Sequence, residues 1–214
     1  MFSPKDSELE RGWPGRIEGD NVIQLAAQTL QAFFTGGGEA REHAEYALAD
    51  VVLRAPVLRP PSVRIFTRDG DFSFANPASI HGPGDVVYLP EGADGIVPVA
   101  RLAAIVGANG AVGGYTLMND WDAPALHGAK ALDFAISLGP IVVTPDEIHV
   151  EADFRELFAH AALNTRLLPG DVIAAPGGQR KELVRAGDVA EVSMEPFGTL
   201  RNSVAQRDGG VANT

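Results

Sequence analysis

The sequence predicts a mixed α/β fold in which β-strands dominate. Its apolar residues fall mostly into short runs rich in β-branched and aromatic side chains, which is typical of strands. The 24 glycines and 15 prolines are spread along the 214 residues and separate these runs, as turns separate strands. Only two segments have a helical character. Together these observations favour a β-rich domain with many turns.

Nine segments are expected to be strands because they are short and rich in β-branched or aromatic residues, with glycine or proline between them. They are residues 50–53, 63–66, 71–74, 86–89, 101–106, 114–118, 141–144, 171–174 and 189–194.

Helical structure is expected only near the N-terminus. Residues 22–34 place apolar side chains at roughly helical spacing before a run of three glycines, although the first half could equally form a strand. Residues 39–46 are a candidate for a short polar helix. A proline-rich connector follows. It predicts a small N-terminal segment over residues 1–55, a main β domain over 56–205 and a disordered tail over 206–214.

Composition excludes several functions. The formal net charge of -11 argues against nucleic acid as a partner and disfavours anionic membranes, although a locally basic pocket can still bind an anionic small molecule. The absence of cysteine excludes disulfides, thiolate nucleophiles and cysteine-based zinc sites, and it fits a cytoplasmic protein. No apolar run is long enough to span a bilayer, and no secretory signal is expected in the polar first ten residues.

Several segments occur in an order that resembles the fumarylacetoacetate hydrolase (FAH) family. They are residues 53–66, which begin Leu-Arg-Ala-Pro-Val-Leu-Arg-Pro-Pro, Phe-Ala-Asn-Pro-Ala-Ser-Ile-His-Gly-Pro-Gly-Asp at 74–85, Leu-Ala-Ala-Ile-Val-Gly at 102–107, Gly-Tyr-Thr-Leu-Met-Asn-Asp-Trp at 114–121, Lys-Ala-Leu-Asp-Phe-Ala-Ile-Ser-Leu-Gly-Pro at 130–140, Leu-Pro-Gly-Asp-Val-Ile at 168–173 and Arg-Ala-Gly-Asp at 185–188. The resemblance covers residues from about 50 to 204 and implies an FAH-type β-roll that forms a homodimer.

The chain departs from this family at the metal site. The resemblance implies four carboxylates around a divalent cation, and hard oxygen ligands of that kind suit magnesium. At three of these positions the chain has Ile65, Val99 and Arg101, so Asp120 is the only family ligand retained. The family's catalytic histidine is missing after Phe66. No metal ligand set and no cofactor is therefore expected, unless these losses are misread and Mg²⁺ or Mn²⁺ binds.

Arg101 and Lys130 are the candidates to replace the cation, with Asp120 as their partner. A guanidinium can clamp a carboxylate or an enolate in bidentate fashion, and positive charge is what the lost metal would have supplied. An alternative remains open, in which an Arg101–Asp120 ion pair merely fills an abandoned pocket. His127 is the best available general base, because it lies where the family places a polar residue that faces the substrate.

Five further residues are candidates for substrate binding. Each has a structural alternative: the aromatic residues can simply pack in the core, and the polar ones can satisfy nearby backbone groups. They are Arg64, His81, Tyr115, Asn119 and Trp121.

Three functions are compatible with this reading of the sequence. The first is a metal-independent lyase, isomerase or cyclase that stabilises an enolate of a small keto-acid, a β-dicarbonyl or a polyketide-like intermediate of secondary metabolism. The second is a catalytically inactive binding protein. The third is a metal-dependent C–C bond hydrolase or decarboxylase, which would need a carboxylate cluster around Asp120, for instance from Asp69, Asp71 or Asp94.

Overall fold

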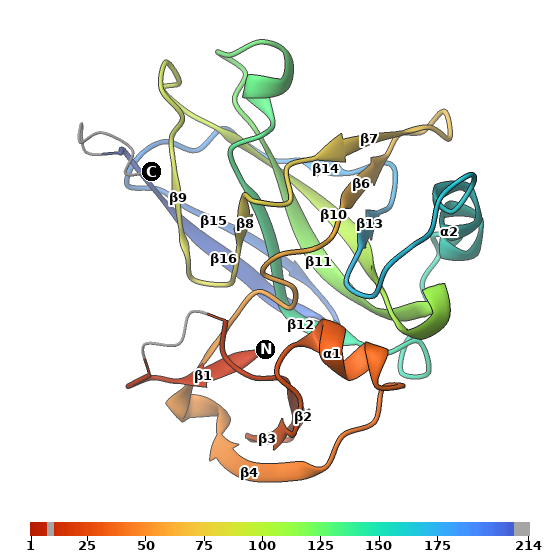
Figure 1. The fold of residues 1–214 in the computed structure, drawn as a ribbon. Helices are drawn as coiled ribbons and strands as arrows, with labels where there is room; N and C mark the ends of the chain where they lie inside the picture. The colour runs from red at the N-terminus through yellow and green to blue at the C-terminus, as the bar shows by residue number, and fades with distance from the viewer. Residues whose placement is uncertain (8–10, 208–214) are drawn as a thin grey trace.

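A computed structural model describes residues 1–7 and 11–207 of the chain. The predicted β-dominated fold is confirmed. Its largest sheet has eight strands and is curled (Figure 1). Its strands run in the order β7-β6-β13-β10-β11-β12-β8, and β14 pairs with β10 beside β13. They are β6 (Val63–Phe66), β7 (Phe72–Ala75), β8 (Ile80–His81), β10 (Val97–Val106), β11 (Val112–Asp122), β12 (Ile136–Val143), β13 (Val172–Ala174) and β14 (Gln179–Arg180).

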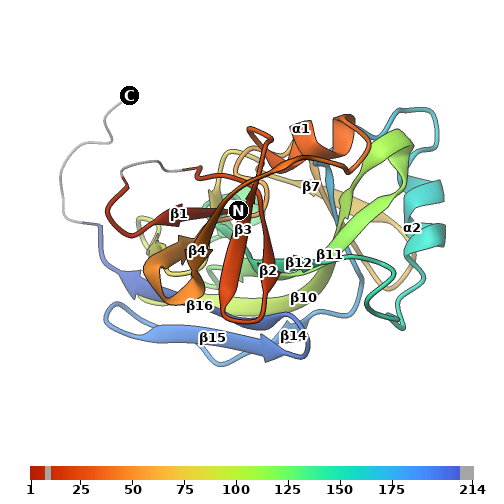
Figure 2. The same ribbon diagram turned by 90° about the horizontal axis from the view of Figure 1, so that it is seen from below.

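A second sheet covers one side of this curled sheet. It contains β9 (Val86–Tyr88), β15 (Val189–Met194) and β16 (Gly198–Ala205), in the order β15-β16-β9. Figure 2 shows β15 and β16 as a layer along one side of the molecule. The amphipathic helix α2 (Phe154–Ala161) buries Phe154 and Phe158 in the same apolar cluster as Leu200 of β16. We call the face of the curled sheet toward this layer its outer face and the opposite face its inner face.

The N-terminal segment forms two small sheets of its own. β1 (Phe2–Pro4) pairs with β5 (Val51–Leu53), and β2 (Gly15–Glu18), β3 (Asn21–Leu25) and β4 (Glu42–Ala47) form an antiparallel meander. None of these five strands joins a sheet formed by β6–β16 within the described ranges 1–7 and 11–207, so the division near residue 55 remains our proposal. Residues 208–214 of the predicted tail lie outside those ranges.

Helix α1 (Leu30–Thr35) connects this segment to the main domain. Thr29 caps it, since its side chain accepts a hydrogen bond from the backbone N–H of Ala32 at 3.0 Å. Phe34 is buried with Val57 and with Ile105 of β10. Three short 3-10 helices, η1 (Leu48–Asp50), η2 (Ala108–Gly110) and η3 (Gly128–Ala131), complete the described structure.

The structure decides both helical expectations for the N-terminal segment, and one of them needs correction. Residues 22–34 are helical only from Leu30, because the preceding residues form β3 and pair with both β2 and β4. The polar helix predicted over residues 39–46 is wrong, since Glu42–Ala47 is a strand. Pairing with β3 outweighed the weak helical propensity of residues 39–46. Helix α2 was not expected from the sequence, and Asp153 caps its N-terminus.

Candidate functional site

The four positions where the resemblance implies metal-binding carboxylates lie on the inner face of the curled sheet. Strand partners that stand opposite each other in an antiparallel pair point to the same face, as do residues two apart along one strand. Asp120 of β11 stands opposite Val99 of β10, and Arg101 follows two residues along β10. Strand β6 pairs with β13, and β13 pairs with β10. The register of these pairs places Ile65 on the same face.

Arg101 and Asp120 form an ion pair on this face. Arg101 Nε lies 3.4 Å from Asp120 Oδ2, and the two side chains are only 16% and 10% exposed. Arg101 Nη1 also donates to the backbone carbonyl of Ala175 at 3.4 Å. The guanidinium is thus turned into the protein rather than into bulk solvent, as the hypothesis of a replaced cation requires.

The loop between β13 and β14 holds Arg101 in this place. Both strands pair with the same edge of β10, and residues 175–178 bulge out between them beside Arg101. A Cβ at Gly178 would lie 2.9 Å from Cγ and Cζ of Arg101 and from Cγ1 of Val99. Any larger residue at Gly178 would therefore push the guanidinium from its position.

Burial sets the protonation behaviour of Asp120. Its pKa is raised above the usual aspartate value because burial removes the carboxylate from water, and the neighbouring charge of Arg101 only partly offsets this effect. A carboxyl whose pKa is raised in this way is a better proton acceptor than an ordinary aspartate.

This raised pKa predicts that Asp120→Asn stabilises the fold at neutral pH. A carboxyl with a raised folded-state pKa contributes stability that is fully present below its unfolded pKa of about 3.9 and is lost as pH rises through the folded value. Asparagine keeps the neutral form at every pH. The free energy of unfolding of the variant should exceed that of the wild type at pH 7, and the difference should shrink toward zero below about pH 4.

Urea unfolding at several pH values measures this difference. Asp133→Asn is the matched control, because Asp133 pairs with Lys130 at the surface and its loss should leave the free energy of unfolding nearly unchanged. A large destabilisation by Asp120→Asn at pH 7 would instead show that the attraction to Arg101 outweighs the cost of burying the carboxylate.

The structure does not bring the other two predicted catalytic residues to the ion pair. Lys130 lies in η3 with its side chain 80% exposed, and its Nζ pairs with Asp133 Oδ2 at 2.6 Å. His127 precedes η3 and is exposed. The hypothesis that Lys130 shares the former cation position with Arg101 therefore needs correction, because the chain after β11 carries Lys130 out to the surface.

The aromatic and amide candidates of β11 point to the outer face. Tyr115 is buried against Phe154 of α2, and burial raises the pKa of its hydroxyl. Trp121 is fully buried, and its indole N–H donates to Ser137 at 2.9 Å. Asn119 is also fully buried, and neither of its amide atoms has a hydrogen-bond partner among the residues described. All three lie on the opposite side of the sheet from Asp120.

Arg64 and His81 also lie away from the ion pair. Arg64 is 5% exposed on the outer face of β6, where Nη1 lies 2.5 Å from Ser62 Oγ and 3.6 Å from Asp171 Oδ2. His81 is half-buried at the end of β8, with Nδ1 3.0 Å from the carbonyl of Ser79. Both residues have local structural partners.

The residues present do not fit a divalent cation. In the described part of the chain, no group of three or more histidine, aspartate or glutamate side chains could hold a metal ion. Two of the three acids considered as replacements have other partners: Thr67 binds Asp69, and the backbone N–H of Phe72 donates to Asp71. Of the three positions that lack the implied carboxylate, two hold apolar residues and the third holds an arginine.

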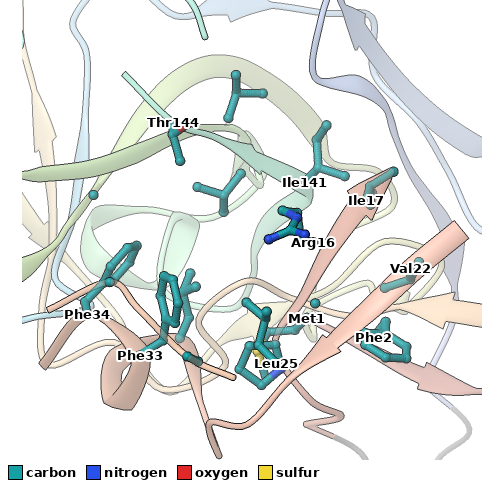
Figure 3. Close-up of a pocket in the computed structure, with 18 of the residues that line it drawn as sticks. Met1, Phe2, Arg16, Ile17, Val22, Leu25, Phe33, Phe34, Ile141 and Thr144 are labelled. Carbon is teal, nitrogen blue, oxygen red and sulfur yellow. The ribbon is translucent and has the colours of Figure 1, made fainter. Parts of the chain in front are cut away.

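A separate cleft lies between the N-terminal segment and the main domain (Figure 3). It has a volume of about 990 Å³, and none of the predicted site residues lines it. Leu25, Phe33 and Phe34 border it on one side and Ile141 of β12 on another. The cleft is therefore separate from the Arg101–Asp120 ion pair.

The site contains two charged residues that the sequence analysis missed. Arg180 of β14 pairs with Asp122 of β11, with Nη1 and Oδ2 2.5 Å apart. Asp122 follows Asp120 by two residues, and this period-2 spacing in a strand could have placed it on the same face. Arg180 belongs to no recognisable motif, so nothing in the sequence pointed to it.

Comparisons with known proteins agree with the fold. No family model matches the chain. It is 24% identical to the oxaloacetate tautomerase YisK of Bacillus subtilis (strain 168), over 87% of this chain and 84% of that protein. The crystal structure of maleylpyruvate hydrolase from Sphingobium sp. SYK-6 matches with a TM-score of 0.77 and 22% identity, over 92% of this chain and 97% of the other. A second structure of that hydrolase, in complex with manganese(II) and pyruvate, has a TM-score of 0.75 and 20% identity, with the same coverage.

These similarities bear on the fold. They confirm the resemblance at that level, and the chain has an FAH-type fold. Within that fold, three of the four carboxylate positions implied by the resemblance are occupied by Ile65, Val99 and Arg101. No helix of residues 1–7 and 11–207 is long and apolar enough to cross a membrane.

Proposed function

We propose that this protein is an enzyme that acts on a small keto-acid by stabilising its enolate without a divalent cation. The observation that carries the proposal is the position of Arg101. Its guanidinium is largely buried on the inner face, next to Asp120, where the resemblance implies a metal-binding glutamate. Relatives that act on small keto-acids support the substrate class, because oxaloacetate and maleylpyruvate appear in their names.

Arg101 supplies the positive charge in this proposal. An enolate oxygen develops negative charge during proton removal from the carbon next to a carbonyl, and a fixed cation in a site that excludes water stabilises that charge strongly. The hydrogen bond to Ala175 and the contact with Gly178 hold the guanidinium in place before the substrate arrives. A preorganised group of this kind needs no rearrangement during the reaction.

Asp120 is the proposed proton carrier. Its raised pKa suits a group that takes a proton from one carbon or oxygen of the substrate and returns it to another. Such a transfer is a tautomerisation or an isomerisation, and neither reaction needs an activated water. Cyclisation, dehydration and decarboxylation could use the same enolate stabilisation. His127 remains a predicted alternative base, although it is exposed in this structure.

Assays on oxaloacetate and other small 2-oxo acids in the presence of EDTA test this function. The conversion between the enol and keto forms of oxaloacetate is followed by ultraviolet absorbance. We expect catalysis in EDTA that does not rise when Mg²⁺ or Mn²⁺ is added in excess. Activity that appears only with added metal would support the metal-dependent hydrolase or decarboxylase instead.

A catalytically inactive binding protein is the second candidate. The Arg101–Asp120 ion pair favours it, because each charged group already has a partner and Lys130 pairs with Asp133 at the surface instead. Metal-free binding of keto-acids without turnover, over a panel of substrates, would support this function. Homodimeric assembly and a cytoplasmic location remain predictions.

A further inference from the structure

The position of the lost carboxylate at Val99 is surrounded by charged side chains from three strands. Val99 of β10 stands opposite Asp120 of β11 on one side and opposite Arg180 of β14 on the other. Residues directly opposite each other in an antiparallel sheet share a face. Arg180, Asp120 and the nearby Arg101 therefore border Val99 on the inner face.

Each of the two arginines is held by one aspartate of β11. Arg101 Nε lies 3.4 Å from Asp120 Oδ2, and Arg180 Nη1 lies 2.5 Å from Asp122 Oδ2. The two aspartates are two residues apart, so both face inward. The result is a pair of neighbouring Arg–Asp contacts across β10 and β11, with the apolar side chain of Val99 between the arginines.

The two arginines differ in their freedom to move. The side chain of Arg101 is 16% exposed and packs under the Gly178 loop, whereas the side chain of Arg180 is 53% exposed. Asp122, its partner, is 20% exposed, so water can reach both groups of this pair and Arg180 can leave Asp122 for a ligand at less cost than Arg101 can leave Asp120. Arg101 is thus suited to a fixed contact and Arg180 to a contact that forms when the ligand binds.

Together the two guanidinium groups carry the charge of one divalent cation. Each is a planar donor that stays protonated at any physiological pH and binds two oxygens of a carboxylate at once. A 2-oxo acid or its enolate presents oxygens on adjacent carbon atoms. Two arginines near Val99 can neutralise such a ligand more fully than a single arginine can, because its negative charge is spread over the oxygens of both carbons.

We propose that Arg180 is the second anion-binding group of this site and that Arg101 and Arg180 together recognise a planar dianion with oxygens on adjacent carbons. This inference rests on the proposed function, since it places the substrate at Arg101. When the ligand binds, Arg180 leaves Asp122 and pairs with the ligand instead. Arg180 thereby favours a doubly charged ligand over a monoanion of the same shape.

Calorimetric titration with oxalate and with oxamate, in EDTA, tests the inference. Oxamate has the shape of oxalate but one negative charge fewer. Arg180→Gln should weaken oxalate binding by about tenfold or more, since charge-assisted hydrogen bonds are lost, and should change oxamate binding by much less. Arg180→Lys should restore part of the oxalate affinity. Arg201→Gln, which removes a similarly exposed arginine from its pair with Glu191, is the matched control and should bind oxalate like the wild type.

The outcomes separate the inference from the proposed function. Wild-type oxalate affinity in Arg180→Gln, combined with lost affinity in Arg101→Gln, would overturn the role of Arg180 and leave the proposed function standing. Oxalate affinity that is unchanged in Arg101→Gln, or absent from the wild-type protein in EDTA, would overturn the proposed function and the inference with it.

Discussion

Arg101→Gln should lower kcat/KM for the keto-acid substrate by on the order of 10²- to 10³-fold, measured in EDTA. Removing one preorganised donor from the position of a developing oxyanion typically has an effect of this size. Glutamine retains hydrogen-bonding capacity but carries no charge. Because Arg101 is largely buried and fixed by the Gly178 loop, no neighbouring side chain of the described site can take its place without a rearrangement.

Two companion variants show whether the loss reflects charge, geometry or folding. Arg101→Lys keeps the charge but loses the planar fork, so it should recover only part of the activity. Arg201→Gln should behave like the wild type, because that residue lies in the sheet of β15 and β16. Urea unfolding of each variant separates a folding defect from a catalytic one. A folded Arg101→Gln protein with wild-type kcat/KM would rule out Arg101 as the stabilising cation.

Asp171→Ala should lower the free energy of unfolding by about 3–5 kcal/mol, the usual effect of removing one partner of a buried ion pair. Asp171 is 2% exposed and lies 3.6 Å from Arg64, which is 5% exposed. Its carboxylate also accepts hydrogen bonds from Ser62 Oγ and from the backbone N–H of Leu168, both at 2.7 Å. The substitution therefore leaves a buried guanidinium without its counter-charge.

A double substitution tests this explanation. Replacing Arg64 by leucine together with Asp171→Ala removes both charges, so it should cost less than Asp171→Ala alone. Chemical denaturation of the two single variants and the double variant gives the coupling energy. If the double variant is no more stable than Asp171→Ala alone, the unpaired arginine is not the main cost. Folded Arg64→Leu should also keep the KM of the wild type, because Arg64 lies on the outer face. A large rise in KM would restore the prediction that it binds substrate.

Local sequence patterns predicted many strands of the main domain but missed β8, β14 and β16, and they predicted the N-terminal segment poorly. β6 and β15 begin and end where their β-branched runs predicted. β10 and β11 extend beyond the predicted residues, because pairing between them continues past the most apolar part of each strand. β4 has a polar sequence that suggested a helix, and only its pairing with β3 makes it a strand. In these cases pairing with another strand, and not the local sequence, decided where a strand forms and how far it extends.

The sequence by itself determined the kind of fold and the composition of the altered site. Ordered motifs indicated an FAH-type protein, and Ile65, Val99 and Arg101 at the implied ligand positions predicted that Asp120 would remain without its usual neighbours. The alternation of side chains along a strand is a local property, so it also put Val99 and Arg101 on one face.

Only the tertiary structure decided which charged groups meet at that face. β14 pairs with β10 opposite Val99, which brings Arg180 to Asp122, while η3 carries Lys130 to the surface and the fold places Asp171 beside Arg64 on the outer face. The physical reason is that a strand's sequence fixes the direction of its side chains, but its neighbours in the sheet are set by pairing and burial over the whole chain.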